Sequence, residues 1–209
     1  MIKFEQIEVW GIKHAIRGMR NPLNSWERSD TVFDGNKMCL GENDVDLMTR
    51  LIRGGAPHRK FLRQIFVSVD ITAPLYWWKE CDTYQVGTTA NSCSTMHKIH
   101  SKEFELADFS TEHLSPLSIN ALKSVIDVMN LEREHYVACK DKDCWWQMIQ
   151  LLPTSYNQKR TVTVTYENLL NMLEYRRGHK LDEWRMFCDW ILTLPHGSLL
   201  KEGVGNEQS

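Results

Sequence analysis

Residues 65–81 read Ile-Phe-Val-Ser-Val-Asp-Ile-Thr-Ala-Pro-Leu-Tyr-Trp-Trp-Lys-Glu-Cys, a stretch that combines two kinds of secondary structure. Apolar residues at every second position from Ile65 to Ile71 predict a half-buried β-strand, because successive side chains of a strand point to opposite faces. Pro74 then stands where a helix tolerates proline, in the first turn, and predicts a helix through Cys81. A strand that leads directly into a helix indicates a mixed fold.

Periodicity elsewhere predicts more helix than strand. Helices are expected after a cap at Asn43 or Asp44, after Ser115-Pro116, from Trp145 to Leu152, from Tyr166 to Arg177, and from Trp184 to Ile191. Strands are expected at Ile7–Trp10 and Arg160–Thr165, and residues 17–26 and 87–94 are expected to be polar turns and loops. The prediction is a single α+β domain over residues 1–200, with a modest sheet and a flexible polar tail over residues 201–209.

Composition narrows the classes of function. The chain has 25 Lys and Arg against 27 Asp and Glu, a net charge of -2, which argues against a protein that coats duplex nucleic acid. No apolar run reaches the roughly 18–20 residues of a membrane span. The N-terminal residues are too polar for a signal peptide. We therefore expect a cytoplasmic protein whose partners include neither a membrane nor duplex nucleic acid.

The six cysteines are scattered through apolar helical segments, which favours reduced and mostly buried thiols over a disulfide framework. Cys139 and Cys144 flank a charged stretch. A zinc knuckle at that place would need a second Cys or His pair at comparable spacing, and none is evident. No metal site is predicted.

The common local motifs of nucleotide and hydrolase sites are absent from the sequence. The order of elements over residues 45–192 nevertheless resembles the flavin-dependent thymidylate synthases. Four stretches carry the resemblance: Leu47–Gly55, Phe66–Pro74, Gly87–Ser94, and Leu152-Pro153 followed by Asn171 and Arg176. It implies the thymidylate-synthase-complementing-protein-like fold, a small antiparallel sheet packed with helices.

The signature of that family is degraded in this chain. Tyr84-Gln85-Val86 stands in place of its Arg-His-Arg, whereas Met96 and Ile149 replace two arginines that hold the dUMP phosphate in the family. Each lost charge-assisted phosphate contact is worth roughly 1.5–3 kcal/mol. Other cations near the matching segments could substitute for them: Lys79, His97, Lys98, Arg176 and Arg177.

The resemblance also implies site residues. It assigns Asn91, Ser92, Ser94 and Arg176 to the nucleotide, and Asn171, Tyr84, Gln85 and His58 to the flavin cofactor; it identifies no catalytic side chain. The residue types leave other roles open. Asn and Ser form turns and caps, an Arg in the last turn suits the helix dipole, and a His after Ala-Pro suits a surface turn. The pairs Trp77-Trp78 and Trp145-Trp146 could stack on a ring, or one Trp of each could face the core and the other a subunit contact.

Two functions remain open at this stage. The first is a diverged flavin-dependent thymidylate synthase, for which the resemblance implies FAD, NADPH, methylenetetrahydrofolate and dUMP in a homotetramer. The second is a non-catalytic oligomer that sequesters a signalling or precursor nucleotide, a role that phage-borne relatives of metabolic folds sometimes fill. A structural subunit is a third, weaker alternative. Nucleotide binding is common to the first two.

Overall fold

The computed structural model describes residues 1–35 and 37–204. The chain divides into two compact units, each assembled from separate stretches of sequence. Unit 1 contains residues 1–5, 70–83 and 90–161, and unit 2 contains residues 6–69, 84–89 and 162 onward. Within the two described ranges, no helix is long and apolar enough to cross a membrane.

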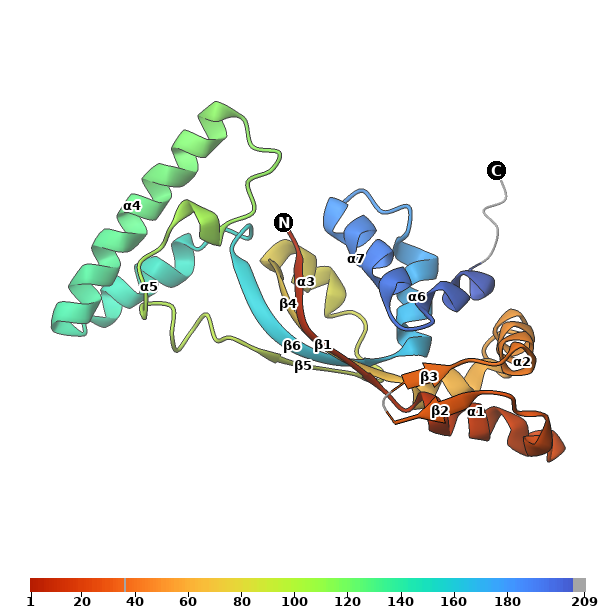
Figure 1. The fold of residues 1–209 in the computed structure, drawn as a ribbon. Helices are drawn as coiled ribbons and strands as arrows, with labels where there is room; N and C mark the ends of the chain where they lie inside the picture. Colours follow the sequence, from red (N-terminus) through yellow and green to blue (C-terminus); the bar gives the residue numbers. More distant parts are fainter. Residues whose placement is uncertain (36, 205–209) are drawn as a thin grey trace. The chain divides into compact units, whose positions relative to one another are not determined.

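The main sheet has four strands in the order β1-β4-β6-β5 (Figure 1). These are β1 (Lys3–Trp10), β4 (Phe66–Pro74), β6 (Asn157–Thr165) and β5 (Thr88–Ser92). Every one of them contributes residues to both units. In β4, Val67, Val69 and Ile71 are buried while their neighbours are half-exposed, as the alternation of the sequence predicts. A separate antiparallel pair joins β2 (Val32–Asp34) to β3 (Lys37–Cys39).

Unit 2 is mainly helical. It holds α1 (Ile12–Arg20), α2 (Glu42–Arg53), α6 (Tyr166–Arg176), α7 (Asp182–Thr193) and the 3-10 helices η1 (Asn21–Leu23), η2 (Trp26–Arg28), η3 (Arg59–Gln64) and η5 (Gly197–Gly203). Its core includes Ile52, Leu62 and Leu169, all nearly inaccessible to solvent. Gly11 precedes α1 at φ +90, and a Cβ there would lie 2.0 Å from the carbonyl oxygen of Gln64. The close approach of α1 to η3 therefore requires glycine.

Unit 1 contains α3 (Leu75–Cys81), η4 (Leu106–Asp108), α4 (Pro116–Cys139) and α5 (Lys142–Leu151). Helices α4 and α5, green to teal in Figure 1, pack side by side. Ser115 caps α4 by accepting a hydrogen bond from the Ser118 amide at 3.3 Å, with Pro116 in the first turn. An apolar cluster fills this part of the unit: Ile99, Phe104, Phe109, Leu122, Ile126, Met129 and Met148.

The predicted α+β class, with a small antiparallel sheet and packed helices, is confirmed. Several local predictions are wrong. The helix expected after a cap at Asn43 or Asp44 begins at Glu42, with Gly41 at its N-cap. Residues 17–20, expected in a turn-rich segment, complete α1, because its apolar members Ala15, Ile16 and Met19 bury one face. Residues 88–92, expected in a loop, form β5, because an adjacent strand supplies hydrogen-bond partners that local sequence does not reveal.

The first residues of the tail expected at residues 201–209 belong to a helix. Lys201–Gly203 are the last residues of η5, and the Glu202 carboxylate accepts a hydrogen bond from the Nε atom of Arg53 at 2.9 Å. The ordered chain therefore continues beyond residue 200, and residues 205–209 of the predicted tail lie outside the described residues.

Candidate functional site

A group of polar side chains, of which Arg59 and Glu167 are buried, joins η3 to α6 in unit 2. Arg59, 8% exposed, donates from Nη2 to the amide oxygen of Asn171 at 2.9 Å and from Nε to Glu167 at 3.4 Å. Arg63 donates to the other carboxylate oxygen of Glu167. We call these four residues the Arg59 cluster. Its carboxylate and amide oxygens accept hydrogen bonds from protein donors, which is how buried polar groups are stabilised.

The C-terminal end of α6 carries a second group, Tyr84, Arg176 and Trp184, called here the Tyr84 cluster. Arg176 donates from Nε to the Tyr84 hydroxyl at 2.9 Å. Its guanidinium carbon lies 4.8 Å from the Trp184 ring centroid and 5.5 Å from that of Tyr84, within the range of cation–π attraction. Trp184 is buried, whereas Tyr84 and Arg176 are half-exposed. The cluster thus presents a cation and an aromatic edge at the surface of unit 2.

The turn after Tyr84 is fixed by an asparagine that the sequence did not single out. Asn168 donates from Nδ2 to the carbonyl oxygen of Val86 and to the Thr88 hydroxyl, the latter at 3.2 Å. Between them, Gly87 has φ +69, and a Cβ there would lie 3.0 Å from Asn168 Nδ2. Gln85 is exposed on this turn. Asn168 therefore positions one of the predicted flavin residues.

In unit 1, the residues predicted to bind the nucleotide lie on and after β5. Asn91 and Ser92 are exposed. The Ser94 hydroxyl oxygen accepts hydrogen bonds from the backbone amides of Met96 at 3.2 Å and His97 at 3.0 Å. Ser94 therefore forms a local turn, the alternative role that its residue type allows, and this turn presents His97 and Lys98 to solvent.

Two cations that sequence reasoning missed lie on β6 beside this segment, since the Cys93 amide donates to the carbonyl oxygen of Lys159 at 2.9 Å. Arg160 stacks on Trp78 at 4.3 Å and donates to Asp82 at 2.6 Å. Lys159 Nζ lies 3.0 Å from a carboxylate oxygen of Asp70. Arg160 begins the strand expected at residues 160–165 and Lys159 lies one residue before it, so only their spatial neighbours reveal them as candidate site residues.

Neighbouring donors stabilise the ionised form of Asp70. The Thr161 hydroxyl donates to it at 2.6 Å, and this bond, followed by that from Lys159, lowers the pKa of Asp70 below its ordinary value. Asp70 in turn raises the pKa of Lys159. The pair therefore stays ionised at neutral pH.

The structure corrects the predicted role of one tryptophan pair. Trp77 and Trp78 are 0% and 1% exposed. Neither indole can stack on a ligand or face a subunit contact; Trp78 instead donates from Nε1 to the carbonyl oxygen of Gln158 at 2.9 Å. In the other pair, Trp145 donates to the carbonyl oxygen of Met96 at 3.1 Å and Trp146 is 40% exposed.

Met96 and Ile149, the two positions where the resemblance implies phosphate-binding arginines, have different surroundings. Met96 is 45% exposed. Ile149 packs against the apolar cluster of α4 and α5. An arginine at residue 149 would have to leave that packing to reach an anion, so this position now stabilises the fold of unit 1.

The predicted site residues therefore lie in separate groups. Asn91, Ser92 and Ser94 belong to unit 1, whereas Tyr84 and Arg176 belong to the Tyr84 cluster of unit 2 and Gln85 follows Tyr84 in the chain. Asn171 belongs to the Arg59 cluster, and His58 is exposed immediately before it.

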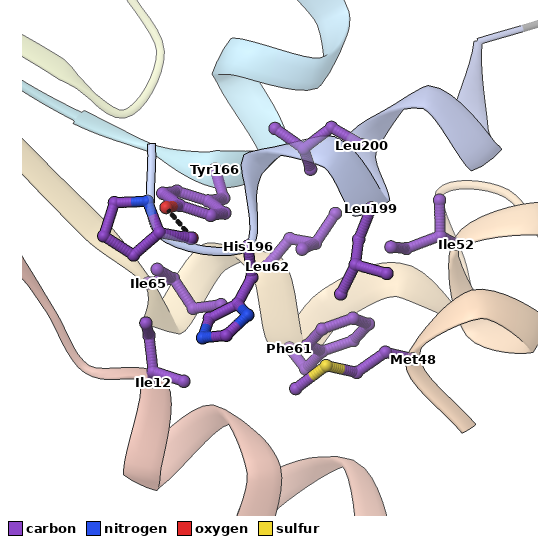
Figure 2. Close-up of a pocket in the computed structure, with 11 residues that line it drawn as sticks. Ile12, Met48, Ile52, Phe61, Leu62, Ile65, Tyr166, His196, Leu199 and Leu200 are labelled. Atoms are coloured by element: carbon purple, nitrogen blue, oxygen red, sulfur yellow. Dashed lines mark hydrogen bonds between the residues drawn. The ribbon is translucent and has the colours of Figure 1, made fainter. Parts of the chain in front are cut away.

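His58 also lines a hollow of about 500 Å³ in unit 2, together with Asn21, Lys60 and Gln64 and several apolar side chains. That volume falls within the roughly 300–1,000 Å³ of ligand pockets. The apolar cavity in Figure 2, between Ile12, Met48 and Leu199, has only about 20 Å³, room for one water molecule. Burial lowers the pKa of His196 at its edge. The hollow, and not this cavity, has the size of an organic ligand.

Comparison with known proteins identifies the fold. No family model and no curated protein matches the sequence. Among solved structures, flavin-dependent thymidylate synthase ThyX from Helicobacter pylori, complexed with FAD and dUMP, matches with a TM-score of 0.68 and 17% identity, over 96% of this chain and all of that one. A second structure of that protein with FAD and dUMP gives 0.70 and 16%, over 99% of this chain and all of that one. The chain therefore has a ThyX-like fold, as its sequence resemblance implies.

Proposed function

We propose that this protein binds a nucleotide on its ThyX-like fold, with a pyrimidine deoxynucleotide of the dUMP type as the first candidate. The observation that carries the proposal is the fold match, which extends over nearly the whole chain to an enzyme solved with dUMP. Exposed Asn91, Ser92, His97 and Lys98 supply hydrogen-bond donors and positive charge of the kind that a nucleotide phosphate requires.

FAD is the proposed cofactor, but the residues at the flavin positions fit it only in part. The Tyr84 hydroxyl accepts a hydrogen bond from Arg176, and the Asn171 oxygen accepts one from Arg59. Gln85 and His58 are exposed, and His58 borders a hollow of ligand size. Of the four positions predicted to contact flavin, Tyr84 and Asn171 thus already have a hydrogen-bond partner within the protein.

The activity that the fold would support is methylation of dUMP, with NADPH and methylenetetrahydrofolate as co-substrates. A specific observation favours the second candidate, capture of a nucleotide without catalysis. Ile149 packs in an apolar cluster where the family has a phosphate-binding arginine, and Tyr84-Gln85-Val86 provides no guanidinium to a flavin. Such a protein would hold a precursor or signalling nucleotide in the cytoplasm and return it unchanged.

A homotetramer is the proposed assembly. Helix α4 exposes several large apolar side chains: Leu117 at 80%, Val128 at 45%, Leu131 at 52% and Val137 at 45%. Exposed apolar surface along one helix supports a contact with another copy of the chain. Sedimentation equilibrium of the purified protein would test it, and a monomer at micromolar concentration would contradict it.

The experiment that tests the proposed function is mass spectrometry of the small molecules released on denaturation, together with the absorption of the native protein in the flavin band. Stoichiometric FAD would favour the thymidylate synthase over nucleotide capture. Oxidation of reduced flavin that depends on dUMP would then establish the enzymatic activity. A colourless protein that releases a nucleotide would establish capture. If nothing is released, calorimetric titration with dUMP and other nucleotides decides, and no binding to any of them would refute the proposal.

A further inference from the structure

The hairpin formed by α4 and α5 brings together three side chains that ligate metals. Glu132 and His135 lie on α4, and Cys144 lies in the first turn of α5. One ligand atom of each lies within 4.8 Å of the other two. No residue of the Arg59 cluster, the Tyr84 cluster or the β5 segment belongs to this group.

The local geometry that assembles the three residues is well defined. Glu132 and His135 are three residues apart, so they share one face of α4. Lys140 adopts the left-handed conformation at φ 59 and ends α4, and the Asp141 carboxylate accepts a hydrogen bond from the Asp143 amide at 2.9 Å and caps α5. The two helices then pack against each other. Cys144 is thereby returned to the face of α4 that carries Glu132 and His135.

The carboxylate and the thiol already interact. A hydrogen bond to Glu132, with burial as the next cause, raises the pKa of Cys144 to about 11. Glu132 and Cys144 are half-exposed and His135 is exposed, which leaves the group accessible from solvent. Cys139 offers a candidate fourth ligand and a second sulfur, because it follows His135 by one helical turn; its Sγ donates to the carbonyl oxygen of His135 at 2.9 Å.

We propose that Glu132, His135 and Cys144 bind a zinc ion, with Cys139 or a water molecule as the fourth ligand. Thiolate and imidazole ligands select zinc over the hard cations Mg²⁺ and Ca²⁺, which prefer oxygen. With bonds of about 2.0–2.3 Å, ligand atoms around tetrahedral zinc lie about 3.5 Å apart, so small side-chain rotations close the present site. On binding, the Cys144 thiol releases its proton to solvent and its sulfur binds the metal as thiolate.

The sequence predicts no metal site because it lacks a second Cys or His pair at the spacing of a zinc knuckle. The ligands of this site instead come from one helical turn and from the start of the next helix. A bound zinc ion would fasten the C-terminal end of α4 to α5, which have no disulfide to hold them: Cys139 and Cys144 are free thiols. The site is independent of the proposed nucleotide function.

The test uses the full-length protein, freed of metal with a chelator and titrated with Zn²⁺ and with Co²⁺. The expected result is one tight zinc per chain, and a thiolate-to-cobalt charge-transfer band on addition of Co²⁺. Cys144→Ser should weaken that band and Cys139→Ser/Cys144→Ser should abolish it, whereas Glu132→Gln and His135→Ala should each weaken zinc binding by at least about tenfold. Glu134→Gln and Cys39→Ser, at exposed positions outside the site, serve as matched controls and should bind as the parent protein does.

Circular dichroism of each metal-free variant separates loss of a ligand from loss of fold. If Cys144→Ser does not fold, zinc binding by Glu132→Gln and His135→Ala decides the question. The first is a polar replacement and the second a truncation, and both change side chains on the surface of α4. Zinc binding that is weak, that exceeds one ion per chain without the charge-transfer band, or that survives in Glu132→Gln and His135→Ala would overturn the proposal.

Discussion

Unit 2 contains two groups in which an arginine donates a hydrogen bond to a side-chain oxygen: Arg20 with Asp44, and Arg176 with Tyr84. The groups differ in burial and in the chemical type of the acceptor. Asp44 is 0% exposed and accepts hydrogen bonds from Arg20 at 2.7 Å, Ser29 at 2.8 Å and Thr31 at 2.6 Å. In the Tyr84 cluster, Arg176 is half-exposed and donates to the hydroxyl of Tyr84. The first group is closed to solvent and joins α1 to α2. The second remains at the surface, where a ligand can reach it.

The comparison shows why an arginine in a sequence does not by itself indicate an anion site. Arg20 precedes a polar turn and resembles a binding residue. Its guanidinium instead forms a buried ion pair with the carboxylate of Asp44. Breaking such a pair costs more than the pair contributes, because the remaining charge is left buried. A partly exposed cation over aromatic rings can exchange one partner for another at lower cost.

The largest effect is expected from Asp44→Ala. This change leaves the Arg20 guanidinium, 3% exposed, without its carboxylate, and should lower the free energy of unfolding by about 3–5 kcal/mol. Urea denaturation monitored by circular dichroism measures it. A loss below about 1 kcal/mol would show that the pair is not buried as described and would remove the contrast between the two groups.

The same group predicts a dependence of stability on pH. Burial by itself would raise the pKa of Asp44, but hydrogen bonds from Thr31, Ser29 and Arg20 outweigh it and hold the pKa below its usual value. Because the folded pKa is the lower one, this stabilisation is complete above the unfolded pKa of about 3.9 and is lost as the pH falls through the folded pKa. Unfolding free energies of the parent protein should fall below pH 4 more steeply than those of Asp44→Asn. Parallel profiles would contradict the assignment.

At the Tyr84 cluster, Arg176→Ala should weaken nucleotide binding by at least about tenfold, or about 1.4 kcal/mol. Asn171→Ala should have a similar effect if its amide faces the ligand, although its bond with Arg59 provides a structural role. Calorimetric titration measures both. Lys180→Ala is the matched control, since this exposed cation is four residues away on the chain and is assigned to no ligand. Unchanged affinity in the folded double variant would make both residues structural.

Tyr84→Phe removes only the hydroxyl that accepts from Arg176 and keeps the ring against Trp184. Stability should fall by about 0.5–1.5 kcal/mol, the usual contribution of one hydrogen bond. Thermal denaturation measures the change. A neutral result combined with tighter nucleotide binding would mean that the tyrosine competes with the ligand for the arginine.

The smallest effect is expected from Asp46→Ala, two residues from Asp44 on α2. Asp46 forms an exposed pair with Arg50 at 2.8 Å, with side chains 65% and 66% exposed. Its loss should change the free energy of unfolding by less than about 0.5 kcal/mol. An effect as large as that of Asp44→Ala would mean that helix disruption, not burial, explains both.

Local patterns of sequence predict much of the fold. Caps and apolar periodicity locate α4, where Ser115 and Pro116 start the helix, and alternation locates β4. Each pattern needs only residues within one or two turns of one another. The Tyr84 cluster could be predicted only in part. The resemblance identifies Tyr84 and Arg176 as site residues but does not identify Trp184 as their partner.

The sequence by itself therefore determined the α+β class, the strand-to-helix passage at residues 65–81 and the resemblance to the thymidylate synthase fold. Tertiary structure alone decided that Trp77 is in the core, that residues 88–92 form a strand, and that Asn171 meets Arg59, 112 residues away along the chain. The same holds for the meeting of Cys144 with Glu132. The reason is physical: helix and strand propensities act over a few residues, whereas burial and pairing depend on which distant segments pack together.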